Sequence, residues 1–211
     1  MYSSELVLPN LTFIIMRLLR IFLCIAPLIA SCAPTPDATN GDNTTDIPPK
    51  YQNNISTIFG TGTTNVKDNT GYYVASNITW KDSLGALHTL DELRGNIIVL
   101  NFWAMWCDYC RQEMPDLQSI ADTYKDQNVI VLGVSVDKGS SAFDEVKLYI
   151  DSTVRVKFQI IVDPPAKSYF NYGAHDGLPW TFIIDADGHV RITFSGEPKK
   201  QQFVDAINQL L

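Results

Sequence analysis

The sequence predicts an α/β domain in which helices flank both faces of a mixed central sheet, with a β-hairpin extension at its N-terminal end. From residue 97 onwards, short apolar runs alternate with amphipathic stretches. The last two apolar runs flank an Asp187-Gly188 turn, a strong hairpin signal, and a final amphipathic stretch follows them. Composition agrees, because 45% hydrophobic and 18% charged residues in a 211-residue chain suit one globular domain plus an extension. The formal charge of −7, without a visible basic patch, argues against nucleic acid as a partner.

The first segment, residues 1–31, is expected to be a signal peptide. Residues 16–20 carry two arginines and form a basic segment, residues 21–29 are apolar, and Ile29-Ala30-Ser31-Cys32 matches a bacterial lipobox. This pattern predicts cleavage before Cys32 and attachment of lipid to that cysteine. An uncleaved anchor or a plain secretory signal is the alternative, although the apolar run is short for a membrane-spanning helix. Because a methionine opens the basic segment, we expect residues 1–15 to be a mis-assigned start.

Residues 32–75 are expected to form a lipid-anchored tether and an extension that the sequence leaves unassigned. Residues 33–50 are rich in Pro, Thr, Asp and Asn and hold almost nothing apolar, which is typical of a flexible tether. Residues 51–75 mix aromatic side chains with a Gly-Thr-Gly run. The extension either packs on the domain or continues the tether.

The main domain is predicted to span residues 76–211 and to open with a hairpin. Residues 77–80 and 86–90 have strand character and flank a turn, and a short helical turn ending at Gly95 follows. We expect His88 to lie on the surface of this hairpin.

The central feature is a buried strand that leads through a Cys-x-x-Cys motif into a helix. Residues 97–102 are almost entirely apolar, and polar residues after Cys110 take up helical spacing to about residue 126. Cys107 then lies at a helix N-terminus, where unpaired N–H groups and the helix dipole favour the thiolate that attacks disulfides. Cys110, one turn further on, is placed to close a disulfide with Cys107.

Two other interpretations of this motif remain open. Half of a zinc site would need two further ligands, but the other cysteines, Cys24 and Cys32, both lie in the N-terminal apolar segment. A purely structural disulfide is possible, but a ring this small removes little chain entropy. Because Cys24 would leave with the signal peptide and Cys32 would carry lipid, Cys107 and Cys110 are the only thiols expected in the mature protein.

The remaining elements alternate in type. We expect strands at residues 129–136, 158–162, 181–185 and 189–195, and helices at residues 141–151, 167–172 and 198–211.

Two motifs connect the chain to a known family. The first is Asn-Phe-Trp-Ala-x-Trp-Cys-x-x-Cys-Arg-x-Glu-x-Pro at residues 101–115, and the second is Gly-Leu-Pro-Trp-Thr-Phe-Ile-Ile-Asp at residues 177–185. Together they resemble the TlpA/ResA-like branch of the thioredoxin superfamily, which consists of membrane-anchored extracytoplasmic thiol–disulfide oxidoreductases. The resemblance implies a thioredoxin fold, and the second motif is similar to the family's cis-proline loop.

Roles follow for four residues. We assign Cys107 as the exposed, attacking nucleophile and Cys110 as the more buried residue that resolves the mixed disulfide. The resemblance implies that Glu113 lies beneath the cysteine pair and assists proton transfer; the alternative is a solvated helix glutamate. It also implies that Pro179 follows a cis peptide bond, rather than being an ordinary trans proline.

The substrate-binding candidates surround these four. Trp106 is expected to pack against Cys107 and shape a docking face, and the Leu178 backbone is expected to pair with an extended substrate. Asp108, between the cysteines, should disfavour a second negative charge and tilt the couple toward donating electrons. Tyr109 stands where the family often has proline. Trp180 replaces the family's usual small polar residue, so it is either a core residue or part of the docking surface.

These assignments predict a protein-disulfide reductase of the cell envelope that is lipid-anchored through Cys32 and faces the periplasm or extracytoplasmic side. The resemblance implies that it would reduce cysteine pairs in exported proteins such as apocytochrome c, with electrons from a membrane thiol donor and without a cofactor or metal. The alternative is a non-catalytic thioredoxin-fold binding protein or a copper or other metal chaperone. His175 would then join Cys107 and Cys110 as a ligand, although such relatives use Cys-x-x-x-Cys.

Overall fold

The computed structural model describes residues 55–61, 67–82 and 84–211. The expected signal peptide, the lipobox with Cys32 and most of the expected tether lie outside these residues. Within the described part of the chain, none of the helices combines the length and the apolar character needed to cross a bilayer.

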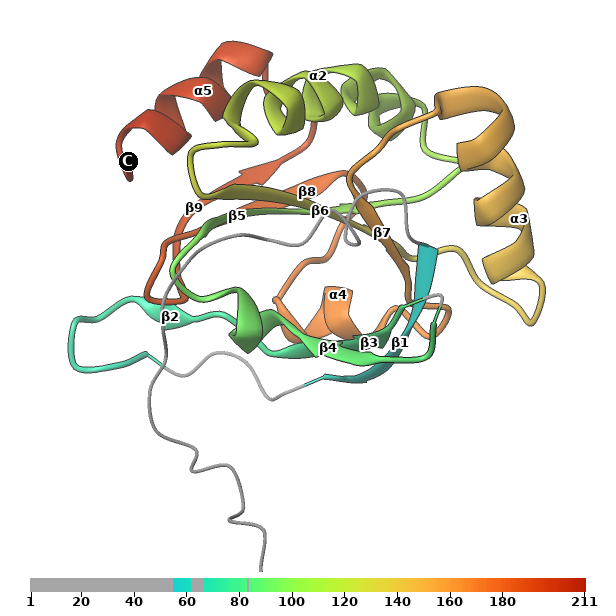
Figure 1. The fold of residues 1–211 in the computed structure, drawn as a ribbon, viewed down its shortest axis with the longest axis horizontal. Coiled ribbons are helices and arrows are strands. Elements are labelled where there is room, and N and C mark those ends of the chain that lie inside the picture. The colour runs from blue at the N-terminus through green and yellow to red at the C-terminus, as the bar shows by residue number, and fades with distance from the viewer. Residues whose placement is uncertain (1–54, 62–66, 83) are drawn as a thin grey trace, which may run out of the picture. The chain divides into compact units, whose positions relative to one another are not determined.

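The described strands form one nine-stranded sheet in the order β2-β9-β8-β5-β6-β7-β1-β3-β4 (Figure 1). The central strand β5 pairs parallel with β6 and antiparallel with β8, so the predicted mixed sheet is confirmed. Every residue of β5 and β6 is buried, because helices cover both faces at the middle of the sheet. The strands are β1 Ile55–Thr61, β2 Tyr73–Val74, β3 Ile78–Lys81, β4 Leu87–Thr89, β5 Ile97–Trp103, β6 Val129–Ser135, β7 Gln159–Val162, β8 Trp180–Ile184 and β9 His189–Ser195.

Helices α2 and α5 lie on one face of the sheet and α4 lies on the other (Figure 1). The predicted periodicity of α2 is confirmed, since Leu117, Ile120 and Tyr124 are buried against the sheet. A single π-turn extends α3 by five residues, and a 3₁₀ turn precedes β5. The helices are α2 Asp108–Tyr124, α3 Ala142–Tyr149, α4 Lys167–Asn171 and α5 Lys200–Asn208, and the 3₁₀ turn is Leu90–Leu93.

Part of the segment that the sequence left unassigned is a strand of this sheet. β1 pairs parallel with β7 on one side and antiparallel with β3 on the other. It therefore joins the predicted hairpin, β3 with β4, to the central sheet as one continuous ladder.

The surface position expected for His88 is wrong. Antiparallel pairing places His88 opposite Trp80, and the two side chains share the buried face of the hairpin, with His88 4% exposed. Its Nε2 atom lies 3.2 Å from a carboxylate oxygen of Asp82. Leu87 takes the solvent-facing position instead and is 56% exposed. The pairing register, which the short sequence run does not reveal, decides which residue faces inward.

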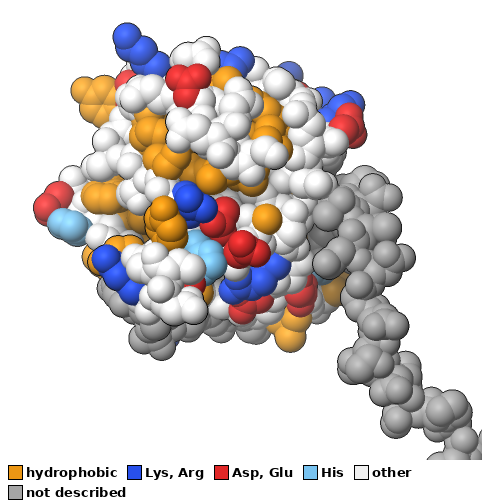
Figure 2. Space-filling view, turned by 90° about the vertical axis from the view of Figure 1, so that its left-hand side faces the viewer, with side chains coloured by type: hydrophobic (Ala, Val, Ile, Leu, Met, Phe, Trp, Pro, Cys, Tyr) orange, Lys and Arg blue, Asp and Glu red, His pale blue; other side chains and the backbone are white. Residues whose placement is uncertain are grey.

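Charged side chains are mixed on the face seen in Figure 2. Lys and Arg side chains are scattered among Asp and Glu there and do not form a continuous basic surface, while hydrophobic side chains gather in a band beside them.

Candidate active site

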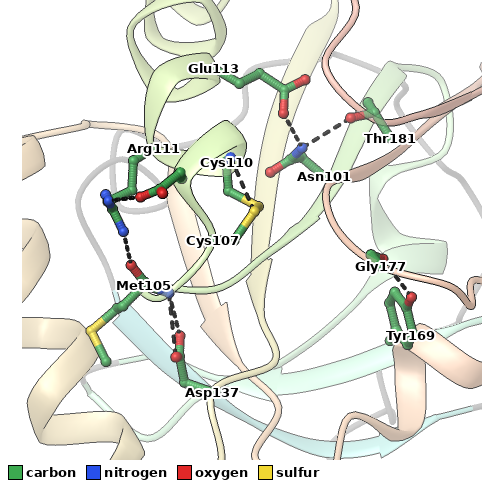
Figure 3. Close-up of a disulfide and its surroundings, with 11 residues drawn as sticks. Asn101, Met105, Cys107, Cys110, Arg111, Glu113, Asp137, Tyr169, Gly177 and Thr181 are labelled. Atoms are coloured by element: carbon green, nitrogen blue, oxygen red, sulfur yellow. Dashed lines mark hydrogen bonds and ion pairs between the residues drawn. A yellow bond between two sulfur atoms is a disulfide. The ribbon is translucent and has the colours of Figure 1, made fainter.

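The cysteine pair lies at the junction of β5 and α2, where the central strand delivers the chain to the N-terminus of the helix (Figure 3). Cys107 is the N-cap residue of α2 and forms a disulfide with Cys110 across a Cα–Cα distance of 5.3 Å. The Sγ atom of Cys107 accepts a hydrogen bond from the Cys110 backbone N–H at 3.1 Å. Cys107 is 6% exposed and Cys110 is 1% exposed, so the exposed position expected for Cys107 is wrong, although Cys107 remains the less buried residue of the two. The same N–H group would stabilise a thiolate on Cys107 after reduction.

Large side chains beside the disulfide face solvent. Trp106 is 68% exposed and Tyr109 is 60% exposed. The Asp108 side chain is exposed and forms an ion pair with Arg111 one turn later. This arrangement leaves an aromatic surface around a nearly buried disulfide, as a docking surface for another protein would require.

The backbone of Met105 is held on both sides, which the sequence motifs do not predict. Its N–H donates to the buried carboxylate of Asp137, at 3.0 Å to Oδ2, and its carbonyl accepts from Arg111 at 2.8 Å. Asp137, just after β6, also accepts a hydrogen bond from Ser135 at 2.8 Å. The loop that carries Cys107 is thereby tied to β6 and to α2 (Figure 3). In the sequence, the feature that could have indicated this role is an acidic residue, Asp137, at the end of an apolar strand.

Glu113 is buried, which contradicts the alternative of a solvated helix glutamate. It lies one turn after Cys110 and is 2% exposed. Burial raises the pKa of Glu113 to about 8, and the negative charges of Glu197 and Asp116 act in the same direction, while a hydrogen bond from Asn101 opposes them. The carboxyl is therefore protonated at neutral pH, with a pKa close enough to neutrality for it to exchange a proton.

A short polar chain links Glu113 to the sheet (Figure 3). The side-chain amide of Asn101 donates to Glu113 Oε2 at 3.1 Å and to Thr181 Oγ1 at 2.9 Å. Asn101 and Thr181 are register partners in β5 and β8, so the two central strands hold the amide in place. Asn101 is the single polar residue within the apolar run of β5, and the sequence analysis gave it no role.

The loop that precedes β8 lies beside this site. The Leu178–Pro179 peptide bond is cis, as the family resemblance implied. The two residues before it, Asp176 and Gly177, have left-handed backbone conformations, with φ of 59° and 113°. Leu178 is partly exposed and Pro179 is buried.

Trp180 lies between the core and the surface. It is partly buried, with its ring stacked on Phe182 at a centroid distance of 6.1 Å. Its indole N–H donates to the backbone carbonyl of His175 at 3.0 Å.

The structure does not support the copper ligand set that the sequence left open. The two ring nitrogens of His175 contact the Gly173 carbonyl at 2.7 Å and the Asp176 carboxylate at 3.5 Å. Among the described residues, the group of potential metal ligands whose atoms lie within 4.8 Å of one another is Asp185, Asp187 and His189, at the β8–β9 turn. The set of Cys107, Cys110 and His175 does not form such a group.

The fold and the cysteine pair define a thiol–disulfide oxidoreductase of the thioredoxin superfamily. Residues 73–193 match the AhpC/TSA family, and the chain belongs to this family. It is 33% identical over 128 residues to the thiol-disulfide oxidoreductase ResA of Bacillus thuringiensis (strain Al Hakam), covering 61% of this chain and 71% of that protein. The resemblance to ResA-like oxidoreductases is therefore confirmed.

Solved structures of similar proteins support the same fold and enzyme class. A thiol:disulfide interchange protein of the thioredoxin family from Chlorobium tepidum TLS is 25% identical, with a TM-score of 0.56, and the match covers 65% of this chain and 94% of that one. The exposed lipoprotein thioredoxin Etrx1 of Streptococcus pneumoniae strain TIGR4 is 26% identical, with a TM-score of 0.55, and the match covers 64% of this chain and 99% of that one. These likenesses confirm the thioredoxin fold and the enzyme class.

Proposed function

We propose that this oxidoreductase is a lipid-anchored reductant of the cell envelope that reduces disulfides in exported proteins. The observation that carries the proposal is the Cys107–Cys110 pair at the start of α2, one helical turn from the buried carboxyl of Glu113. The lipobox at Cys32 supports the envelope location and the membrane anchor. The similar Streptococcus pneumoniae protein is itself described as an exposed lipoprotein.

The first step is attack on the substrate. The Cys107 thiolate, stabilised by the helix N-terminus, attacks one sulfur of the substrate disulfide and forms a mixed disulfide. The other substrate sulfur leaves as a thiolate and takes a proton from solvent. The exposed side chains of Trp106 and Tyr109 contact the substrate protein in this step, and the Leu178 backbone pairs with its extended chain.

The second step releases the product. Glu113, in the ionised fraction that a pKa of about 8 leaves at neutral pH, accepts the proton of the Cys110 thiol. The Cys110 thiolate then attacks the Cys107 sulfur, forms the intramolecular disulfide and releases the second substrate sulfur as a thiolate, which takes a proton from solvent. Two electrons pass to the substrate, and Glu113 is left protonated. The described oxidised state has this protonation at neutral pH, because burial raises the pKa of Glu113 to about 8.

Regeneration needs a thiol electron donor, which we place in the membrane. We propose oxidised cysteine pairs of exported proteins as the substrate class, with apocytochrome c as the first candidate. Asp108 between the cysteines favours electron donation, because a second negative charge near a thiolate is unfavourable.

A trapping experiment tests this chemistry. Cys110→Ser should accumulate a mixed disulfide between Cys107 and a disulfide-bonded apocytochrome c, whereas Cys107→Ser should accumulate none. The trap should be resolved by dithiothreitol and visible on a non-reducing gel. If Cys110→Ser captures no substrate while Cys107 remains alkylatable, the proposed substrate class is wrong.

The direction of electron flow is tested by the reduction potential of the Cys107–Cys110 couple, measured by equilibration with glutathione and dithiothreitol. A potential near or below about −250 mV supports a reductant, and a potential near −120 mV would make the protein an oxidant.

A further inference from the structure

Two aromatic side chains bind the backbone of the loop that ends at the cis peptide. The Tyr169 hydroxyl donates to the carbonyl of Gly177 at 2.7 Å, and the Trp180 indole N–H donates to the carbonyl of His175 at 3.0 Å. Tyr169 comes from α4 and Trp180 from the first position of β8, so the loop is held from two different elements.

Both donors are themselves fixed by packing. Tyr169 is 7% exposed, and its ring meets Phe102 of β5 edge-on at a centroid distance of 5.8 Å. The Trp180 ring stacks on Phe182 on one side and lies 5.8 Å from the His175 ring. An aromatic side chain has few torsions to restrict, so these donors hold the carbonyls at little entropic cost.

The backbone N–H and carbonyl of Leu178 remain available for hydrogen bonding. Beyond the cis bond, the Pro179 carbonyl accepts from the Gly196 N–H at 2.9 Å. Within the described part of the chain, the N–H and the carbonyl of Leu178 have no hydrogen-bond partner. The carbonyls on both sides of Leu178, those of Gly177 and Pro179, are occupied, so Leu178 presents the backbone groups that remain available to an incoming chain.

We propose that Tyr169 and Trp180 are positioning residues that fix the direction of the Leu178 backbone groups and so set the register in which a substrate strand docks beside Cys107. This inference rests on the proposed pairing of the substrate with Leu178. It also gives Trp180, which departs from the family pattern, a function as a hydrogen-bond donor to the loop. Selectivity for protein disulfides over small disulfides follows, because a small disulfide has no strand to align.

Two conservative variants test the inference. Tyr169→Phe removes one hydroxyl, and Trp180→Phe removes the indole N–H but keeps an aromatic ring against Phe182. We measure kcat/KM for insulin and for cystine, and amide hydrogen exchange across residues 173–180. In each variant the ratio of kcat/KM for insulin to that for cystine should fall about fivefold, as expected for loss of one net hydrogen bond, through KM rather than kcat. Exchange in the loop should rise.

The matched control is Tyr124→Phe at the far end of α2, where the Tyr124 hydroxyl donates to Asn208 at 2.9 Å. It removes one tyrosine hydrogen bond elsewhere and should leave both the ratio and the loop exchange unchanged. Loop exchange that stays at the wild-type level in both test variants overturns the inference, as does faster exchange with an unchanged ratio. If the wild-type enzyme fails to reduce insulin, the proposed function is wrong, and loop exchange alone then decides whether the two side chains hold the loop.

Discussion

Replacement of Glu113 by Gln should change how stability depends on pH. Glu113 is 2% exposed, and its pKa is raised from 4.5 to about 8, mainly by burial. In the unfolded chain the carboxyl ionises near its ordinary value. Between these two values the folded protein binds a proton that the unfolded chain has lost, so the wild type loses stability as the pH rises from about 4.5 to about 8. Glutamine has no proton to lose and escapes this effect.

The magnitude follows from the pKa values. Each pKa unit corresponds to about 1.4 kcal/mol, and at pH 7 the folded carboxyl is still mostly protonated. The stability of the wild type is therefore compared with that of Glu113→Gln at each pH. Between pH 4 and pH 7, the wild type should lose about 3 kcal/mol relative to the variant, because the carboxyl of the unfolded chain ionises above 4.5. The difference should level off above pH 8. A constant offset from the new amide group does not affect this pH-dependent part.

The assay is urea unfolding of both oxidised proteins at intervals from pH 4 to pH 9, with the disulfide intact. The control is Glu145→Gln, which changes an exposed glutamate on α3 whose carboxylate accepts a hydrogen bond from Ser141. Its stability should run parallel to that of the wild type. Parallel curves for Glu113→Gln would refute the reasoning, because they would mean that Glu113 titrates alike in the folded and unfolded states.

Two further predictions concern packing and hydrogen bonding around the site. Asp137→Ala removes the acceptor of the Met105 N–H and should lower the free energy of unfolding by about 2 kcal/mol, with faster hydrogen exchange at Met105. Unchanged exchange there would show that Asp137 does not hold the loop. Gly133→Ala places a Cβ 2.7 Å from Ile160 Cδ1 and 3.0 Å from Phe158, so overpacking should cost about 1–3 kcal/mol in urea unfolding. An alanine variant as stable as the wild type would contradict this.

The central elements could be predicted because their signals are local. Continuous apolar runs define β5 and β6, and periodic apolar residues define α2, so the predicted bounds agree with the observed ones to within one or two residues. The hairpin register could not be predicted in the same way. His88 is buried rather than exposed, because pairing with Trp80 decides which face of the hairpin is buried.

The residues of the candidate site also fall into those that the sequence predicts and those that it does not. The cysteines, Glu113 and the Leu178-Pro179 pair were found because they fall in two compact motifs. Asn101 and Asp137 were missed, since each acquires a partner only when separate strands and loops come together. Tyr169 was missed for the same reason. Its partner is the backbone carbonyl of Gly177, and every residue has such a carbonyl, so the sequence does not indicate the contact.

By itself, the sequence determined the class of fold, the redox pair and the order of elements around it, because hydrophobic periodicity and a Cys-x-x-Cys motif act over a few neighbouring residues. Tertiary contacts determine the continuation of the sheet through β1 to the hairpin, the burial that raises the pKa of Glu113, and the aromatic donors that hold the loop before β8. These features depend on distance and desolvation between segments far apart in the chain. Those quantities exist only in the folded protein.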